Sequence, residues 1–308
     1  MSRNTLILID GNAIMHRVYH ALPPLSAKNG TPTNVVYGFL SMLYKVVSYF
    51  SPSYLAVVFD TPKPTFRYQL FKEYQIQRPK IEDDFVKQIP LVKEALDLAG
   101  VYRLEKEGYE ADDVIGTICH FFKSNPNFKI IIVSGDKDIF QLISTNVYVA
   151  TLVAGLSDLK IYNSQDVEKK LHVSPNHITD FKALAGDPSD NYPGAKGIGP
   201  VTALKLIRQF GDIDNIYKNL DKISSKKIRE ILKKEKEKVY LSKKLATIII
   251  DAAIKIDIKK MKFNGFDKKL KNFLEKYQIN SLIKRIFEED KKEKKQQEEV
   301  RIEQKTLF

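Results

Sequence analysis

Leu-Ile-Leu-Ile-Asp at residues 6–10 is a short apolar run that ends in a carboxylate. Two more runs of this kind follow, Ala-Val-Val-Phe-Asp at 56–60 and Ile-Ile-Val-Ser-Gly-Asp at 131–136. Short runs rich in β-branched residues are typical of buried strands and are too short for buried helices. We therefore predict strands at residues 6–9, 55–59, 129–133 and 147–151.

Helix-like patterns separate these runs and predict helices at residues 35–50, 85–99 and 111–122. A chain that alternates strand and helix in this way predicts an α/β fold, in which a mostly parallel sheet is covered on both faces. After about residue 165 the strand signals fade, and short helices joined by turns with Gly and Pro are expected at 175–210 and 222–246.

These patterns predict three parts of the chain. We expect an α/β domain over residues 1–165, a helical region over 166–287 and a tail over 288–308. The tail is rich in charged residues and poor in apolar ones, so we expect it to be solvated.

The composition narrows the class of protein. The 308 residues include 50 Lys and Arg against 38 Asp and Glu, a formal net charge of +12. This excess indicates a polyanionic partner, and the alternative is that surplus lysine serves solubility alone. Hydrophobic residues make up 43% of the chain, which excludes disorder throughout. Cys119 has no second cysteine to pair with, and no apolar run reaches the roughly 18 residues of a membrane span. Because the start also lacks a secretory pattern, we expect a cytoplasmic protein without membrane contact.

Carboxylates stand where a parallel sheet would bring them together. Asp10, Asp60 and Asp136 each follow a predicted strand, and ligands of open parallel sheets bind outside the carboxyl ends of the strands. Each Asp alone has another explanation, as a turn residue or a helix N-cap. Six more acids stand at predicted helix starts or in turns: Glu110, Asp112, Asp113, Asp138, Asp187 and Asp190.

Nine carboxylates in one cleft would raise each other's pKa and oppose folding unless cations were present. Oxygen ligands select magnesium or manganese over zinc, and the five histidines form no zinc pattern. A negative metal pocket within a basic protein is what hydrolysis of a nucleic-acid phosphodiester requires.

Gly194-Ala-Lys-Gly-Ile-Gly-Pro200 is the most specific short motif. Its glycines permit a tight turn between two helices, Pro200 suits a first helical position, and the freed backbone amides can bind a phosphate oxygen. This helix-hairpin-helix pattern contacts the duplex backbone without reading bases, and an ordinary turn between helices is the alternative. The residues expected to contact DNA here are Lys196, Gly197, Gly199, Lys205 and Arg208.

Residues 66–80 interleave aromatic and basic side chains. This mixture suits single-stranded nucleic acid, with stacking from the rings and charge from Arg and Lys. An amphipathic helix that covers the sheet would give the same pattern.

Several motifs, in order from about residue 5 to 285, together resemble the 5′-3′ exonuclease domain of bacterial DNA polymerase I, which belongs to the flap endonucleases. They are Ile-Asp10-Gly-Asn, Val-Phe-Asp60, Phe-Arg67, Tyr74-x-x-x-Arg78, Glu110-Ala-Asp112-Asp113, Gly-Asp136-Lys-Asp138, Gly-Asp187-Pro-Ser-Asp190-Asn and Gly-Ile-Gly. The resemblance implies a PIN-like α/β domain with a helical arch over the site, followed by a helix-hairpin-helix region.

The resemblance also implies two bound divalent cations, magnesium or manganese. The acids would divide into Asp10, Asp60, Glu110 and Asp112 nearest the first ion, Asp113 and Asp136 bridging or supporting, and Asp138, Asp187 and Asp190 at the second. Such a site would hydrolyse phosphodiesters near a 5′ end or at a 5′ flap, on DNA with 5′ ends, nicks or flaps and on RNA primers, during replication and repair at the nucleoid.

The remaining site residues follow from the same resemblance. Arg17 and Arg78 would stabilise the charge on the phosphate, Tyr74 would also be catalytic, and Arg67 would contact DNA. The family usually has lysine directly after this tyrosine, whereas this chain has glutamine at 75, and Lys72 is the candidate substitute.

Two other functions remain open from the sequence. One is a structure-specific DNA-binding protein that is weakly active or inactive as a nuclease, and the other is an RNA-cleaving PIN-type nuclease. The last residues add a possible partner, because Gln304, Leu307 and Phe308 resemble the peptide by which bacterial replication proteins bind the sliding clamp. The alternative is that this end folds back onto the protein or does nothing.

Overall fold

Six strands form one sheet in the order β3-β2-β1-β4-β5-β6, in a computed structural model that describes residues 3–78, 81–153 and 158–289. The strands are β1 (Asn4–Asp10), β2 (Tyr54–Phe59), β3 (Tyr102–Glu105), β4 (Phe128–Val133), β5 (Val147–Leu152) and β6 (Leu159–Tyr162). Neighbouring strands run parallel except for β5 and β6, which are antiparallel. The predicted mostly parallel sheet is confirmed.

The two edge strands, β3 and β6, were not expected from the sequence. Each has only four residues, Tyr-Arg-Leu-Glu and Leu-Lys-Ile-Tyr, and each is paired on one side only. A charged residue interrupts each segment, so neither forms the apolar run that marks a buried strand.

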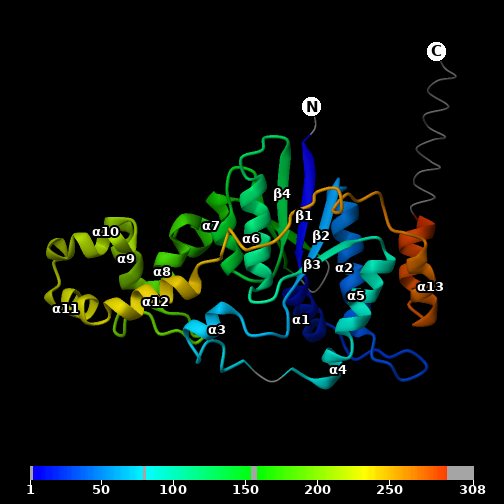
Figure 1. Cartoon of the computed structure of the whole chain (residues 1–308), viewed down its shortest axis with the longest axis horizontal. Helices are drawn as coiled ribbons and strands as arrows, with labels where there is room; N and C mark the ends of the chain where they lie inside the picture. The colour runs from blue at the N-terminus through cyan, green and yellow to red at the C-terminus, as the bar shows by residue number, and fades with distance from the viewer. Residues whose placement is uncertain (1–2, 79–80, 154–157, 290–308) are drawn as a thin grey trace, which may run out of the picture.

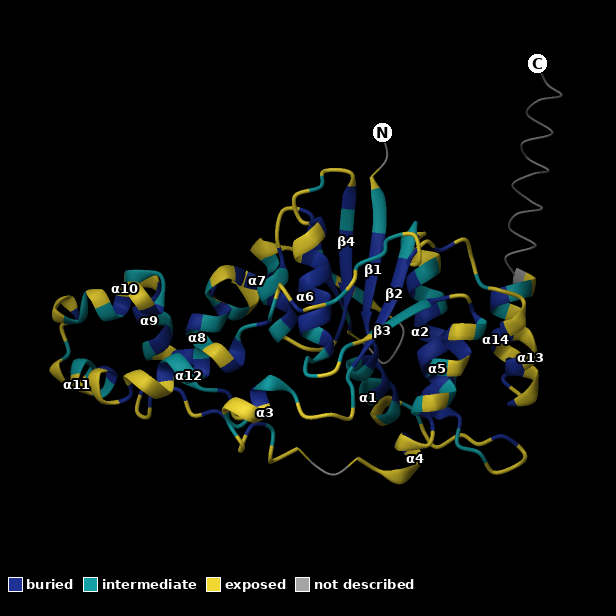
Figure 2. Cartoon of the chain, in the orientation of Figure 1, coloured by how far each residue is buried: buried dark blue, intermediate teal, exposed yellow. Residues whose placement is uncertain are grey.

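The central strand β1 joins two hydrophobic cores. Leu6 and Leu8 face the core under α6 (Ala111–Phe122), whereas Ile7 and Ile9 face the core under α2 (Asn34–Phe50) and α5 (Ile89–Leu98). This division follows from the alternation of side chains along a strand. Figure 2 shows the result, with β1, β4 and α6 mostly buried at the centre of the molecule.

The helix predicted at 85–99 is interrupted. The structure has a short α4 (Asp83–Val86) and then α5, with Gln88 between them. The buried Gln88 side chain accepts a hydrogen bond from the backbone N–H of Val35 (2.8 Å) and donates one to Asn34 Oδ1 (2.9 Å). These hydrogen bonds hold the turn between α4 and α5 against the start of α2.

A set of helices extends to one side of the sheet (Figure 1). It contains α7 (Ser164–Leu171), η2 (Pro175–His177), α8 (Ile178–Ala185), α9 (Pro200–Phe210), α10 (Ile213–Lys218), η3 (Leu220–Lys222), α11 (Lys226–Lys234) and α12 (Lys236–Ala246). The buried Asp180 of α8 pairs with Lys243 of α12 (2.7 Å), which joins these two helices. The expected helical region is therefore present, and none of the described helices is long and apolar enough to cross a membrane.

The chain then returns to the α/β layer. The backbone N–H of Leu55 donates to Met261 (2.7 Å), and that of Phe263 donates to Ser53 (3.0 Å). Next come α13 (Lys269–Lys276), α14 (Asn280–Ile283) and a last turn (Lys284–Glu289), and Phe273 is buried in the core under α2 and α5. The expected helical region 166–287 is therefore not one packing unit. Residues after about 260 pack on the α/β layer and not on the helices that precede them.

Candidate functional site

Parallel strands bring three aspartates to one edge of the sheet. Asp10 ends β1, and Asp60 and Asp136 follow β2 and β4, the two neighbours of β1. Asp10 caps α1 (Gly11–Ala21) by accepting a hydrogen bond from Ala13 N–H (3.0 Å), and its other oxygen accepts one from Ser134 (2.8 Å). Asp10 is therefore both the N-cap of a helix and a carboxylate at the ligand-binding edge of the sheet.

The start of α6 completes this first cluster of carboxylates. Asp60 accepts a hydrogen bond from the backbone N–H of Ala111 (2.7 Å), which fixes the helix start against the end of β2. Glu110 is the N-cap of α6, and Asp112 lies in its first turn. Asp10, Asp60, Glu110, Asp112 and Asp136 all line one cavity of about 410 Å³.

The protonation of this first cluster reflects its crowding. Burial, together with the charge of Asp60, raises the pKa of Asp10 to about 7. Burial also raises the pKa of Glu110 to about 7 although Arg67 opposes it, and burial with the charge of Asp10 raises the pKa of Asp112 well above its ordinary value. Full ionisation at neutral pH therefore needs a compensating cation, and carboxylate oxygens fit magnesium or manganese.

A second cluster of carboxylates lies between the end of β4 and the turn after α8. Asp138 begins η1 (Asp138–Leu142) after β4, whereas Asp187 and Asp190 lie in the turn after α8. Their carboxylate oxygens lie within 4.8 Å of one another, a span that one cation can fill. Burial raises the pKa of Asp138 to about 6 against the effect of Lys182. Burial would raise the pKa of Asp187 too, but hydrogen bonds from Lys182 and Ser189 hold it below its ordinary value.

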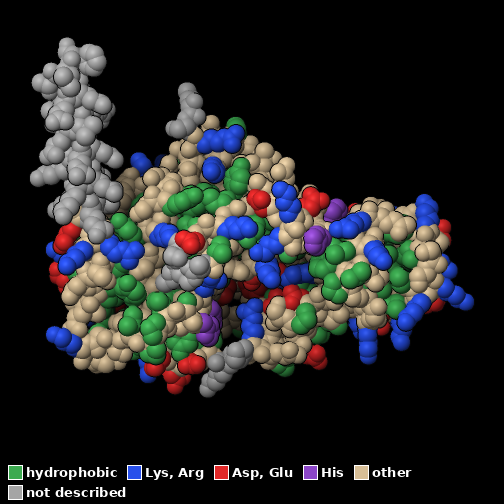
Figure 3. Space-filling view, turned by 180° about the vertical axis from the view of Figure 1, so that it is seen from behind, with side chains coloured by type: hydrophobic (Ala, Val, Ile, Leu, Met, Phe, Trp, Pro, Cys, Tyr) green, Lys and Arg blue, Asp and Glu red, His purple; other side chains and the backbone are tan. Residues whose placement is uncertain are grey.

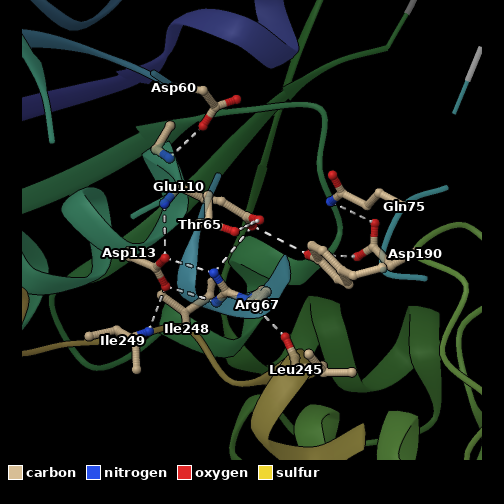
Figure 4. A network of polar contacts seen from close by, with 12 residues as sticks. Asp60, Thr65, Arg67, Gln75, Glu110, Asp113, Asp190, Leu245, Ile248 and Ile249 are labelled. Carbon is tan, nitrogen blue, oxygen red and sulfur yellow. Dashed lines mark hydrogen bonds and ion pairs between the residues drawn. The ribbon is translucent and has the colours of Figure 1, made fainter. Parts of the chain in front are cut away.

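Asp113 and Arg67 form a buried ion pair beneath the first cluster (Figure 4). The guanidinium donates to both carboxylate oxygens of Asp113 at 2.7 and 2.8 Å, and also to the carbonyls of Leu245 and Thr247 at 2.9 Å. Asp113 in addition accepts a hydrogen bond from the backbone N–H of Ile249 (2.8 Å). Both side chains are closed off from solvent, so the structure does not expose Arg67 to DNA as expected. The guanidinium also lies 3.2 Å from Glu110, so the pair supports the first cluster from beneath.

Residues 66–86, where the resemblance implies a helical arch, contain two short helices, and we call this segment the strap. They are α3 (Phe66–Leu70) and α4, and the turns between them are described as far as residue 78 and again from 81. Gln75 has a left-handed backbone with φ of 58°, which no α-helix accommodates. The described residues therefore form a looped strap and not a continuous helix.

This strap contacts both clusters. The buried Tyr74 hydroxyl lies 3.4 Å from Glu110 and 3.5 Å from Asp190. Gln75 and Arg78 each donate a hydrogen bond of 3.0 Å to the same carboxylate oxygen of Asp190 (Figure 4 shows the glutamine). Tyr74, Gln75 and Arg78 also line the cavity of the first cluster.

Two further candidates lie apart from these contacts. Lys72 is exposed, and its ammonium lies over the ring of Tyr68 at 4.6 Å. Arg17 lies on α1 with its Nε buried and without a hydrogen-bond partner among the described residues. Gln75 lines the cavity of the first cluster, and Lys72 does not.

The glycine-rich hairpin connects the turn after α8 to α9. Gly197 has φ of 101°, a conformation that side chains disfavour, and Pro200 occupies the first turn of α9. Lys196, Gly197, Gly199, Lys205 and Arg208 are all exposed. A Cβ at Gly199 would meet nothing within 4 Å, so this position is free of packing constraints from the described protein.

The structure adds residues that the sequence reasoning did not select. His16 lines the cavity and stacks on Phe85 with ring centres 4.5 Å apart. Ser134 links Asp10 to the backbone N–H of Asp136 (3.0 Å). Lys182 contacts both Asp138 and Asp187, and its only sequence signal is a place one helical turn before the Gly-Asp motif.

Two family models match the chain. Residues 5–172 match the N-terminal resolvase-like domain of 5′-3′ exonucleases, and residues 173–269 match their C-terminal SAM fold. The 5′-3′ exonuclease of Aquifex aeolicus is 41% identical over 283 residues, which are 92% of this chain and 95% of that protein. DNA polymerase I of Bacillus subtilis is 38% identical over 288 residues, and there the chain spans 33% of the relative.

Solved structures show the same fold. A bacteriophage T5 D15 flap endonuclease, solved as a complex with DNA and metal ions, has a TM-score of 0.69 at 20% identity and covers 88% of this chain and 98% of its own. The catalytic core of Rad2 with DNA has a TM-score of 0.56 at 18% identity, over 90% of this chain and 88% of its own. At these identities the likeness establishes the fold alone.

We predict that Arg67→Met lowers the free energy of unfolding by about 3–5 kcal/mol, because it leaves the Asp113 carboxylate buried without its partner. Arg67→Met combined with Asp113→Leu should recover part of this loss, since it removes both charges of the pair but leaves the N–H of Ile249 without its acceptor. Urea unfolding of the two variants and wild type measures the effect. A single variant as stable as wild type would contradict the scaffold role of this pair.

Proposed function

The chain belongs to the 5′-3′ exonuclease family, and from this membership we propose that it hydrolyses DNA phosphodiesters at 5′ ends and at 5′ flaps. The observation that carries the proposal is the meeting of two carboxylate clusters beneath the strap. One cluster lines a cavity and the other spans a single cation site. Their oxygens fit two magnesium or manganese ions, and we assign Asp10, Asp60, Glu110, Asp112 and Asp136 to the first and Asp138, Asp187 and Asp190 to the second.

In such a site the divalent ions supply an activated water and stabilise the oxygen that leaves. The protein's own side chains hold the phosphate in the orientation that the reaction requires. Arg78 is half-exposed at the cavity and still free to turn from Asp190 toward a phosphate. Tyr74 fixes the strap against Glu110, and Gln75 contributes amide hydrogen bonds where the family usually has a charge.

We propose that duplex DNA binds the helices from α7 to α12 that extend to one side of the sheet, here called the helical extension. The hairpin presents Lys196 beside exposed backbone at Gly197 and Gly199, and Lys205 and Arg208 follow on α9. Figure 3 shows Lys and Arg side chains over this end of the molecule and around the recess that holds acidic side chains. A basic surface around an acidic recess would guide a polyanion to the cations bound within it.

The main experiment compares a labelled 5′-flap DNA, a nicked duplex and single-stranded RNA, with and without magnesium. We expect magnesium-dependent cleavage of the flap and the nick. Binding of the flap without cleavage under every condition would support the DNA-binding alternative, and cleavage of single-stranded RNA alone would support the RNA nuclease.

Asp112→Asn should lower flap cleavage by at least about 100-fold while flap binding persists, because the hairpin holds DNA away from the metal site. Single-turnover cleavage in magnesium and fluorescence anisotropy in chelator measure the two quantities. Asp84→Asn, which changes an exposed carboxylate of α4, is the matched control. Near wild-type turnover in Asp112→Asn would remove Asp112 from the first cluster's function.

Gly199→Val should weaken duplex binding about tenfold, the equivalent of one or two lost hydrogen bonds to phosphate. The loss should be the same for duplexes of different sequence, since the hairpin touches no base. Because a Cβ at 199 would meet nothing within 4 Å and φ is −87°, the fold should stay intact by thermal unfolding. Equal affinities at matched salt would refute phosphate binding by this loop.

Two further partners extend the proposal. RNA primers paired to DNA present the same 5′ ends, so we infer that the enzyme removes them at the nucleoid during replication and repair. The clamp-binding peptide with Gln304, Leu307 and Phe308 lies outside the described residues, and its support is the sequence pattern alone. Titration of a bacterial sliding clamp with the full chain should give tighter binding than with a chain ending at Glu303, and equal binding would exclude the peptide.

A further inference from the structure

The second cluster contains a cation of the protein's own. Lys182, in the last turn of α8, places its ammonium against Asp138 and 2.5 Å from an oxygen of Asp187. Only 18% of its side chain is exposed. The side chain is therefore held among the carboxylates and does not extend into solvent.

The position of this ammonium overlaps the candidate cation site. Asp138, Asp187 and Asp190 bring their oxygens within 4.8 Å of one another, and Lys182 contacts two of these three residues. The third, Asp190, receives hydrogen bonds from Gln75 and Arg78. Every carboxylate of the second cluster thus already has a donor from the protein, and two of these donors carry positive charge.

A divalent ion on the same oxygens would stand within a few ångströms of the ammonium. Two positive charges at that distance repel strongly, and they also compete for the same lone pairs. The lysine side chain is a flexible stem of four carbons, so the ammonium can leave the oxygens without movement of the helix. The helix itself stays fixed on its other side by the pair between Asp180 and Lys243.

Resting on the proposed metal-dependent function, we propose that Lys182 is a tethered counter-ion that occupies the second cation site of the metal-free protein and leaves it when a divalent ion binds. The lysine stabilises the empty cluster and weakens the second ion relative to the first. It is a positioning residue, since it acts on the carboxylates that hold the metal.

Calorimetric titration of the full chain with manganese tests this without reference to activity. Wild type should bind two ions, and Lys182→Met should bind the second more tightly by about tenfold or more because no charge competes, while the first is unchanged. Lys182→Arg should stay near wild type. Lys169→Met, which changes an exposed lysine of α7 away from the second cluster, should bind both ions as wild type does.

A second ion that binds Lys182→Met with equal or lower affinity would overturn the proposal. If wild type binds two ions but Lys182→Met does not bind the second one more tightly, only the counter-ion role fails, and the proposed metal-dependent function is unaffected. A chain that binds no second ion in any variant would overturn the counter-ion role together with the two-ion assignment.

Wild-type protein gives an independent measurement in case Lys182→Met does not fold. Brief acetylation followed by peptide mass spectrometry should modify Lys182 faster when manganese is present, because the displaced ammonium becomes accessible. The rate at Lys243 should not change. A rate at Lys182 that is unchanged or lower with manganese would overturn the proposal.

Discussion

Repulsion between carboxylates is the constraint around which this structure is arranged. Three parallel strands deliver Asp10, Asp60 and Asp136 to one edge, and the start of α6 adds more acids to the same cavity. Burial makes the repulsion worse, and it raises the pKa of Asp10 to about 7. Three features reduce this repulsion: protonation of the carboxylates, backbone N–H donors such as that of Ala111, and cationic side chains at the second cluster.

The buried pair of Arg67 and Asp113 connects this site to the rest of the molecule. Arg67 comes from the strap and Asp113 from α6, while the carbonyls of Leu245 and Thr247 come from the end of α12. Three segments far apart in sequence are therefore joined at one guanidinium. A buried arginine of this kind fixes geometry, because its planar donors accept few alternative arrangements.

The strap couples the two clusters in a similar way. Tyr74 lies between Glu110 and Asp190, and Gln75 and Arg78 both bind the carboxylate of Asp190. A cation bound at the second cluster would therefore share the oxygens of Asp190 with the strap that lies over the cavity. Lys182 pairs with the remaining two acids, so the second cluster is the point where the end of β4, the strap and helix α8 meet.

The sequence by itself determined the central strands and the aspartates that follow them, because both signals are local: an apolar run, then a carboxylate. It also determined the hairpin, since glycine and proline act on their own backbone. The edge strands β3 and β6 and the return of Phe273 to the first core gave no local signal, because their place depends on what they pack against. Asp112 and Asp113 are adjacent and alike in sequence, yet one lines the cavity and the other is buried against Arg67, since successive helix residues point in different directions. Only the tertiary structure could decide between them, as it alone places Lys182 among the carboxylates of the second cluster.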